Sequence, residues 1–152
     1  MITLKPGDKA PAFEGKIENG ETVKLSDFEG KKLILYFYPK DNTPGCTLES
    51  QNLRDNIDTL RKKGYEVLGI SSDSEASHQR FIDKHCLPFH LIADTDKTVH
   101  EMFGTWQEKK NFGKTYMGTV RTTFVIDETG HIEQVIKKVK TKEHASQILE
   151  EA

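Results

Sequence analysis

The chain has 152 residues, of which 35% are hydrophobic and 30% charged, with 22 lysines and arginines against 24 aspartates and glutamates. This near balance leaves no field of one sign that would hold nucleic acid or an anionic membrane, so we expect neither partner. The longest apolar stretch, residues 33–38, is far too short to cross a bilayer. We expect one cytoplasmic domain over residues 1–152, in which two cysteines do not make a disulfide framework.

The first half of the chain predicts strands that alternate with helices. Its expected elements are one arm of an N-terminal hairpin at 21–25, a strand covered on both faces at 33–38, a helix at about 46–63 ended by Gly64, a strand at 65–71, and a helix at 74–85 with Ser74 as its N-cap. The order of strand, helix, strand and helix implies that the two central strands are parallel.

The second half predicts a hairpin and a closing helix. Its expected elements are a short strand near 89–92, a helix near 97–103, strands at 122–127 and 132–138, and a helix at 141–150. The turn sequence Glu128-Thr-Gly130 makes the last two strands antiparallel. The whole order suggests the α/β class and a thioredoxin-like fold, with a central mixed sheet flanked by helices and an N-terminal hairpin extension.

Cys46 falls in the first turn of the helix that follows the central strand. Unpaired backbone N–H groups and the positive end of the helix dipole favour a thiolate there. The Thr43 hydroxyl is close enough in sequence to reach the sulfur, and Pro44 and Gly45 suit a tight approach to the helix. A free cysteine is also often only a small buried apolar residue, so local chemistry leaves both interpretations open.

The pattern Pro39-x-x-x-Thr43-x-x-Cys46, inside YFYPKDNTPGCTLE, resembles the active-site segment of peroxiredoxins of the Q type, also called bacterioferritin comigratory proteins. Further similar segments, spread over essentially the whole chain, are Gly7-Asp-Lys-Ala-Pro11, Val67-Leu-Gly-Ile-Ser71, Gly113-Lys-Thr-Tyr-Met-Gly118 and Arg121-Thr-Thr-Phe124. The resemblance implies an antioxidant thiol peroxidase that reduces hydrogen peroxide and organic hydroperoxides. It also implies thioredoxin or a similar thiol as reductant, and no metal, haem or flavin cofactor.

The resemblance further implies a role for each residue of the motif. Cys46 would attack the terminal oxygen of a hydroperoxide and become a sulfenic acid. Thr43 would orient the thiolate and the peroxide, and Pro39 would shield the sulfur from bulk water. Arg121 would stabilise the thiolate and the charge on the displaced oxygen, although an arginine entering a strand is, without the motif, more typical of a surface.

Other residues near the motif have either two possible roles or no assigned role. Glu49, one turn after Cys46, either orients Arg54 or a backbone group, or simply favours the start of a helix. Lys40 and Asp41 receive no role. A group of large side chains is expected either at the rim of the site, where it would accept an organic peroxide or a second subunit, or in the core: Trp106, Phe112, Tyr116 and Met117.

The route that clears the sulfenic acid depends on Cys86. Q-type relatives with a second cysteine in the active-site helix carry it where this chain has Gln51, and others carry it in the following helix, near Ile82 in our alignment. A helix from Ser74 would place Cys86 about 18 Å from the edge that carries Cys46, whereas a disulfide needs Cα atoms about 4.4–6.8 Å apart. We therefore prefer a one-cysteine cycle with an external thiol, in which Cys86 is a half-buried structural residue. Cys86 as resolving thiol is the alternative.

The remaining motifs point to no other chemistry. No H-x-x-x-H or C-x-x-C pattern occurs, so we expect structural or surface roles for the histidines and no metal site. A thiol-disulfide oxidoreductase would need the missing C-x-x-C. A thioredoxin-like binding or chaperone module with an incidental cysteine is the alternative from a different class, and we expect a monomer or weak homodimer. The six histidines are His78, His85, His90, His100, His131 and His144.

Overall fold

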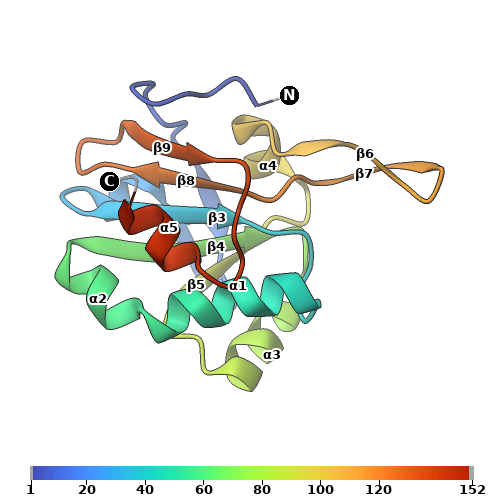
Figure 1. The fold of residues 1–152 in the computed structure, drawn as a ribbon, viewed down its shortest axis with the longest axis horizontal. Helices are drawn as coiled ribbons and strands as arrows, with labels where there is room; N and C mark the ends of the chain where they lie inside the picture. Colours follow the sequence, from blue (N-terminus) through green and yellow to red (C-terminus); the bar gives the residue numbers. More distant parts are fainter. Residues whose placement is uncertain (1, 151–152) are drawn as a thin grey trace.

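The computed structural model describes residues 2–150, and its main sheet has five strands (Figure 1). These are β3 (Lys32–Phe37), β4 (Tyr65–Ser71), β5 (His90–Ala93), β8 (Thr122–Ile126) and β9 (Ile132–Ile136). Their order is β5-β4-β3-β8-β9, with β3, β4 and β5 parallel and β8 antiparallel to both β3 and β9. This mixed α/β sheet confirms the predicted thioredoxin-like class. The antiparallel pair β1 (Glu14–Lys16) and β2 (Thr22–Lys24) is the predicted N-terminal hairpin.

Helices cover both faces of the sheet. They are η1 (Leu25–Phe28, a 3-10 helix), α1 (Pro44–Asp55), α2 (Ile57–Lys62), α3 (Glu75–His85), α4 (Thr98–Phe103) and α5 (His144–Glu150). One buried cluster joins β3 to α1, α2, α3 and α5, and a second joins β3 to the N-terminal segment and α4. No helix within residues 2–150 is both long and apolar enough to cross a membrane.

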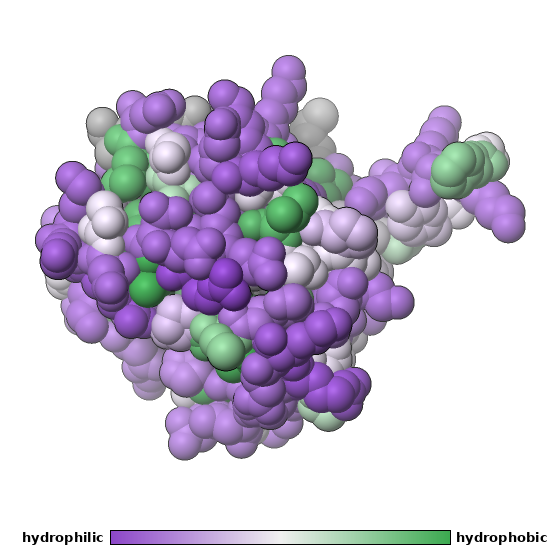
Figure 2. All heavy atoms as spheres, turned by 60° about the horizontal axis from the view of Figure 1, so that its bottom comes forward, coloured by the Kyte–Doolittle hydropathy of each residue, from purple (hydrophilic) through white to green (hydrophobic). Residues whose placement is uncertain are grey.

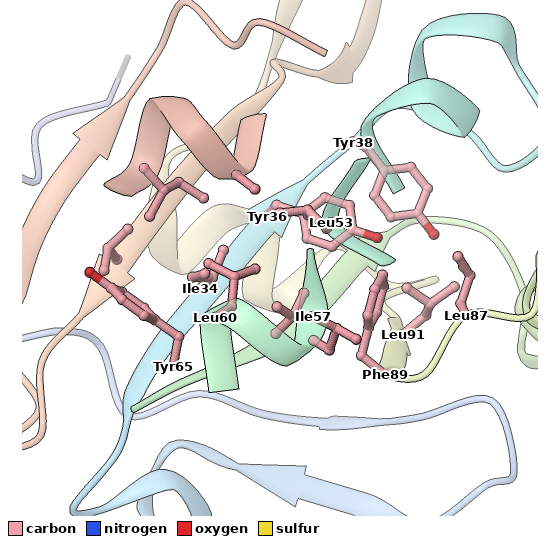
Figure 3. Close-up of a cluster of buried hydrophobic side chains, with 14 of the residues drawn as sticks. Ile34, Tyr36, Tyr38, Leu53, Ile57, Leu60, Tyr65, Leu87, Phe89 and Leu91 are labelled. Atoms are coloured by element: carbon pink, nitrogen blue, oxygen red, sulfur yellow. The ribbon is translucent and has the colours of Figure 1, made fainter. Parts of the chain in front are cut away.

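Strand β3 is buried on both sides because its side chains alternate between the two clusters. Ile34 and Tyr36, followed by Tyr38 just beyond the strand, point into the cluster under α1, which Figure 3 draws. Leu35 and Phe37 belong to the opposite cluster. Every residue from 33 to 38 is fully buried, which fits the continuous apolar run that predicted a central strand.

The predicted helix over 46–63 is wrong in one respect, because the structure divides it at Asn56. That residue has φ −109° and ψ 10°, outside the helical region, and it separates α1 from α2. The side-chain amide of Asn56 donates to the carbonyl of Asn52 at 2.8 Å. Such local side-chain to backbone bonds compete with helix propagation and are a reason for asparagine's low helix propensity.

The hairpin formed by β6 (Trp106–Asn111) and β7 (Lys114–Thr119) was not predicted. It projects beyond the edge where β3 ends and β8 begins, and Figure 2 shows this arm standing away from a mostly hydrophilic body. Phe112 at its turn is 96% exposed, and Tyr116 and Met117 are also exposed. The predicted alternative that these three side chains lie in the core is therefore wrong. Trp106, at the base of the arm, is half-buried and meets the ring of His100 edge to face.

Candidate active site

The start of α1 places the Cys46 sulfur at the carboxyl edge of the parallel strands. Thr43 is the N-cap, Pro44 is the first helical residue and Cys46 is the third. Proline suits that first position because its fixed φ is already helical and its missing N–H would have no partner. Cys46 is fully buried in the cluster between α1 and the sheet, so its sulfur lies among apolar side chains except where one cation reaches it.

That cation is Arg121. The antiparallel register pairs Phe37 with Thr122, so Arg121 arrives at the edge where β3 ends and the loop to Cys46 begins. Its Nη2 donates to the Cys46 Sγ at 3.2 Å, and its Nη1 donates to Glu49 Oε1 at 2.5 Å. Burial disfavours its charge, but Glu49 and Cys46 outweigh burial and raise the pKa of Arg121, which keeps the guanidinium charged.

Glu49 is the second acid beside Arg121. Burial raises the pKa of its carboxyl to about 7, while the charge and hydrogen bond of Arg121 act in the opposite direction. The expectation that Glu49 orients Arg54 is wrong, because Arg54 instead bonds Asp55 and the His85 carbonyl. Glu49 points to the loop before β8 because that face of α1 is turned to the sheet.

His144, the first residue of α5, lies on the other side of Glu49. Its Nε2 is 3.5 Å from Glu49 Oε2, and both side chains are fully buried. Burial lowers the pKa of His144 to about 4. Sequence reasoning placed this histidine among structural or surface residues, since it is 95 positions from Glu49 and no local pattern joins the two.

Thr43 and Pro39 lie on the loop that leads from β3 to Cys46. The Thr43 hydroxyl donates to the Lys40 carbonyl at 2.8 Å, so in this structure its hydrogen does not point to the sulfur. Both Thr43 and Pro39 are half-buried. Gly45 is also close to the guanidinium, because a Cβ built there would lie 3.3 Å from Arg121 Nη2. The loop therefore borders the Arg121 and Cys46 pair closely.

A second buried network fixes this loop from beneath. The Tyr38 hydroxyl donates to Asp41 Oδ1 at 2.6 Å, and both the Ser77 hydroxyl and His78 Nδ1 lie 2.8 Å from Oδ2. Burial opposes ionisation, but the bonds from His78, Tyr38 and Ser77 lower the pKa of Asp41. Asp73 Oδ2 accepts from the Asp41 backbone N–H at 2.8 Å. Asp41, which received no role from the sequence, therefore ties the loop to the start of α3.

Asp41, Asp73 and His78 are also a group of possible metal ligands. One ligand atom of each lies within 4.8 Å of the others. These atoms already hydrogen-bond within the protein, and His78 Nε2 is 2.9 Å from the Ile92 carbonyl oxygen, which only accepts. The arrangement fits an anchor for the loop better than a metal site.

Cys86 lies at the far end of α3 from this edge. It is the exposed C-cap residue, with left-handed φ 52° and ψ 48°, and both cysteines are free thiols. The adjacent His85 Nδ1 is 3.3 Å from Gln51 Nε2, so the end of α3 lies beside the middle of α1. The expectation that Cys86 is half-buried is wrong, since the helix ends before it.

Comparisons with known proteins agree with this geometry. Residues 6–135 match the AhpC/TSA family. The chain is 46% identical over 149 residues to the Bacillus subtilis peroxiredoxin Bcp, covering 98% of this chain and 95% of that protein. It superposes on a Xylella fastidiosa PrxQ variant with a TM-score of 0.90 at 31% identity, covering 97% of this chain and 94% of that one.

A third relative is a Xanthomonas campestris bacterioferritin comigratory protein whose structures concern its alkyl peroxide reduction activity. It is 32% identical, with a TM-score of 0.86 and coverage of 99% of this chain and 96% of that one. The relatives match nearly from end to end, and the motif residues Thr43, Cys46 and Arg121 meet at one edge of the sheet. The chain therefore belongs to the AhpC/TSA family and, within it, to the Q-type peroxiredoxins, which are thiol-dependent peroxidases.

Proposed function

We propose that Cys46 is the peroxidatic residue of an enzyme that reduces hydrogen peroxide and alkyl hydroperoxides in antioxidant defence. The single observation that carries this role is the 3.2 Å bond from Arg121 Nη2 to the Cys46 sulfur in the first turn of α1. A buried thiolate is costly unless it is paired, and here a guanidinium and the helix N-terminus both favour it. The same guanidinium is placed to stabilise the negative charge that builds on the oxygen displaced from the hydroperoxide.

The chemistry balances with one proton from the medium. The Cys46 thiolate attacks the terminal oxygen of ROOH, the sulfur–oxygen bond forms and the oxygen–oxygen bond breaks. The leaving RO⁻ takes up the proton, which gives ROH and Cys46 sulfenic acid. A thiol then displaces water from the sulfenic acid and forms a mixed disulfide. A second thiol releases Cys46 in its reduced form.

Thr43 and Pro39 are proposed to position the peroxide. The Thr43 hydroxyl donates its hydrogen to the Lys40 carbonyl. Its oxygen can therefore accept a hydrogen bond from the O–H of a hydroperoxide. Pro39 is half-buried on the same loop, and its proposed role is to exclude water from the sulfur. Alkyl hydroperoxides are included because the Xanthomonas campestris relative carries that activity.

We propose a one-cysteine cycle with thioredoxin or another small thiol protein as reductant. Cys86 lies at the opposite end of α3 from the active edge, and Gln51 occupies the position where relatives carry a thiol in α1. A cytoplasmic location suits two free thiols. The enzyme would work as one domain over residues 1–152, as a monomer or weak homodimer.

Intact mass after one equivalent of hydrogen peroxide tests these proposals together. Wild type and Cys86→Ser should each gain one oxygen atom, thioredoxin with its reductase should remove it, and Cys46→Ser should gain none. Oxidation of Cys46→Ser at the wild-type rate would reject Cys46 as the peroxidatic residue. A wild type that loses two hydrogens, while Cys86→Ser gains oxygen, would instead establish Cys86 as the resolving thiol.

A further inference from the structure

The side-chain amide of Gln147 fixes which nitrogen of His144 carries hydrogen. Its Nε2 donates to the Lys138 carbonyl at 2.8 Å, and its Oε1 accepts from the Lys140 backbone N–H at 3.0 Å. Oε1 also lies 2.9 Å from His144 Nδ1, which must therefore be the donor. With the ring neutral, the other nitrogen, Nε2, presents a lone pair, and the Thr123 hydroxyl donates to it at 2.7 Å.

This lone pair faces an oxygen that lacks a partner. Within residues 2–150, Glu49 Oε2 is buried and has no hydrogen-bond partner, and it lies 3.5 Å from His144 Nε2. An ionised oxygen there would meet a second acceptor and remain unpaired, which is unfavourable for a buried charge. A protonated Oε2 would instead have the Nε2 lone pair in front of it and would share that acceptor with the Thr123 hydroxyl.

The charges around Glu49 also favour the protonated form of its carboxyl. Cys46 on the same helix and Arg121 before β8 are its nearest ionisable neighbours, with His144 on α5 and Tyr36 on β3. Burial holds the pKa of Tyr36 well above its usual value, so this phenol is neutral. One guanidinium therefore serves two buried acids, and ionising both would bury a net negative charge.

We propose that Glu49 works as a neutral carboxylic acid whose proton points at His144. The positive charge of Arg121 is then left for the Cys46 thiolate. His144 is a positioning residue, because it acts only by accepting this proton. The inference rests on the peroxidatic role proposed for Cys46 and specifies the charge state in which that role is performed.

The proposal predicts that the rate constant for Cys46 oxidation depends on pH. Burial places the pKa of Glu49 at about 7, so the carboxyl loses its proton as the pH rises through neutrality. The ionised carboxylate then competes with the thiolate for Arg121. The rate constant for Cys46 oxidation should therefore fall on the alkaline side, by about tenfold between pH 6.5 and pH 9.

The variant Glu49→Gln separates a neutral from an ionised role. A glutamine keeps an acceptor for Arg121 and a donor for His144, so it imitates the protonated acid. We expect its rate constant to stay within about threefold of the wild-type maximum and the alkaline fall to disappear. A loss of about a hundredfold or more at every pH would mean that Glu49 must be ionised, which overturns the proposal. Glu143→Gln, which removes an exposed carboxylate next to His144, is the matched control and should keep the wild-type profile.

A double-mutant comparison tests His144. His144→Leu removes the acceptor for the Glu49 proton. In the wild-type background the alkaline fall in rate should therefore begin at lower pH. In the Glu49→Gln background the same substitution should leave the pH profile unchanged. An equal effect in both backgrounds overturns the positioning role. Far-UV circular dichroism of each variant checks that it is folded.

Infrared difference spectra provide a readout that needs neither turnover nor the His144 variant. Wild type at about pH 6, compared with about pH 9, should contain the carbonyl stretch of a buried carboxylic acid that Glu49→Gln lacks. Identical spectra for the two proteins overturn the proposal. Failure of Cys46 to oxidise at any pH would reject the proposed function instead, and the infrared comparison would still report the proton on Glu49.

Discussion

The two cysteines of this chain both lie at helix ends, yet the fold treats them in opposite ways. Cys46 is the third residue of α1, fully buried, and bonded to the Arg121 guanidinium. Cys86 is the C-cap of α3, exposed, and held in a left-handed backbone conformation. Cys46 therefore lies at the helix end that has free N–H groups, whereas Cys86 lies at the helix end that has free carbonyls.

This contrast separates two causes of thiol reactivity, charge and exposure. Exposure alone would make Cys86 the more reactive thiol. The positive helix end and Arg121 place positive charge beside the Cys46 sulfur, whereas Cys86 lies at the negative end of the α3 dipole. The fold therefore gives the proposed peroxidatic residue a neighbouring positive charge but little accessibility. Variants that act on one cysteine only will measure the contribution of each cause.

The largest effect is expected from Arg121→Gln. The amide can still donate a hydrogen bond but carries no charge, so both the thiolate and the developing oxyanion lose their cation. The rate constant for Cys46 oxidation by hydrogen peroxide should fall by about 10²–10³-fold, the usual cost of one lost oxyanion donor. Competition kinetics against a second peroxidase measures it.

Arg121→Lys and Cys86 provide the controls. The lysine variant keeps the charge without the fork that contacts Cys46 and Glu49, so it should fall between wild type and Arg121→Gln. Alkylation of Cys86 should be the same in all three proteins. An unchanged oxidation rate in Arg121→Gln would contradict the role of charge at Cys46.

Thr43→Val should have the next largest effect. The two side chains are nearly isosteric, but valine cannot accept a hydrogen bond from the peroxide or donate one to the Lys40 carbonyl. A loss of about 10- to 100-fold in the Cys46 oxidation rate corresponds to one hydrogen bond in a charged site. Thr43→Ser keeps the hydroxyl and should retain most of the rate. Equal rates for the valine and serine variants would reject the role of the hydroxyl.

The sequence predicted the parts of the fold that local patterns determine. The apolar run at β3, the N-cap Ser74 and the turn before β9 were all placed correctly, since each depends on neighbouring residues. The β6–β7 hairpin was missed because most of its residues are exposed and no apolar alternation marks it. Its turn pairs Phe112 at φ 52° with Gly113 at φ 76°, a conformation that the Asn111-Phe-Gly sequence signals only weakly.

The site was predictable only as far as the family motif extends. Pro39, Thr43 and Cys46 are local, and Arg121 was found by resemblance, since no periodicity joins it to a position 75 residues earlier. The partners of Glu49 could not be found this way. His144 meets it because α5 docks on α1, where the Ala145 backbone N–H donates to Asn52 Oδ1 at 2.8 Å. Such a contact depends on tertiary packing.

Gly45→Ala is expected to have a smaller effect, with opposite signs on rate and stability. The new Cβ would lie 3.3 Å from Arg121 Nη2, so the guanidinium must move a few tenths of an ångström from its place beside Cys46. The Cys46 oxidation rate should fall by about three- to tenfold. Alanine in a helix is more stable than glycine by roughly 0.5–1 kcal/mol, so the unfolding midpoint in urea should rise. A fall in both quantities would indicate that the backbone, rather than the guanidinium, had shifted.

The smallest effect is expected at the other cysteine, where Cys86→Gly should stabilise the protein without changing its peroxide chemistry. The residue occupies the left-handed region at φ 52° and ψ 48°, which costs a side chain about 1–2 kcal/mol and glycine almost nothing. Part of that gain is offset by the greater freedom of glycine in the unfolded chain, so we expect the free energy of unfolding to rise by about 0.5–1 kcal/mol. Urea unfolding measures it, and Cys86→Ala, which keeps the strain, should stay near wild type. Because Cys86 is exposed and removed from the charge at Cys46, the rate of sulfenic acid formation should be the same in all three proteins. A slower rate in Cys86→Gly would contradict the separation of the two thiols.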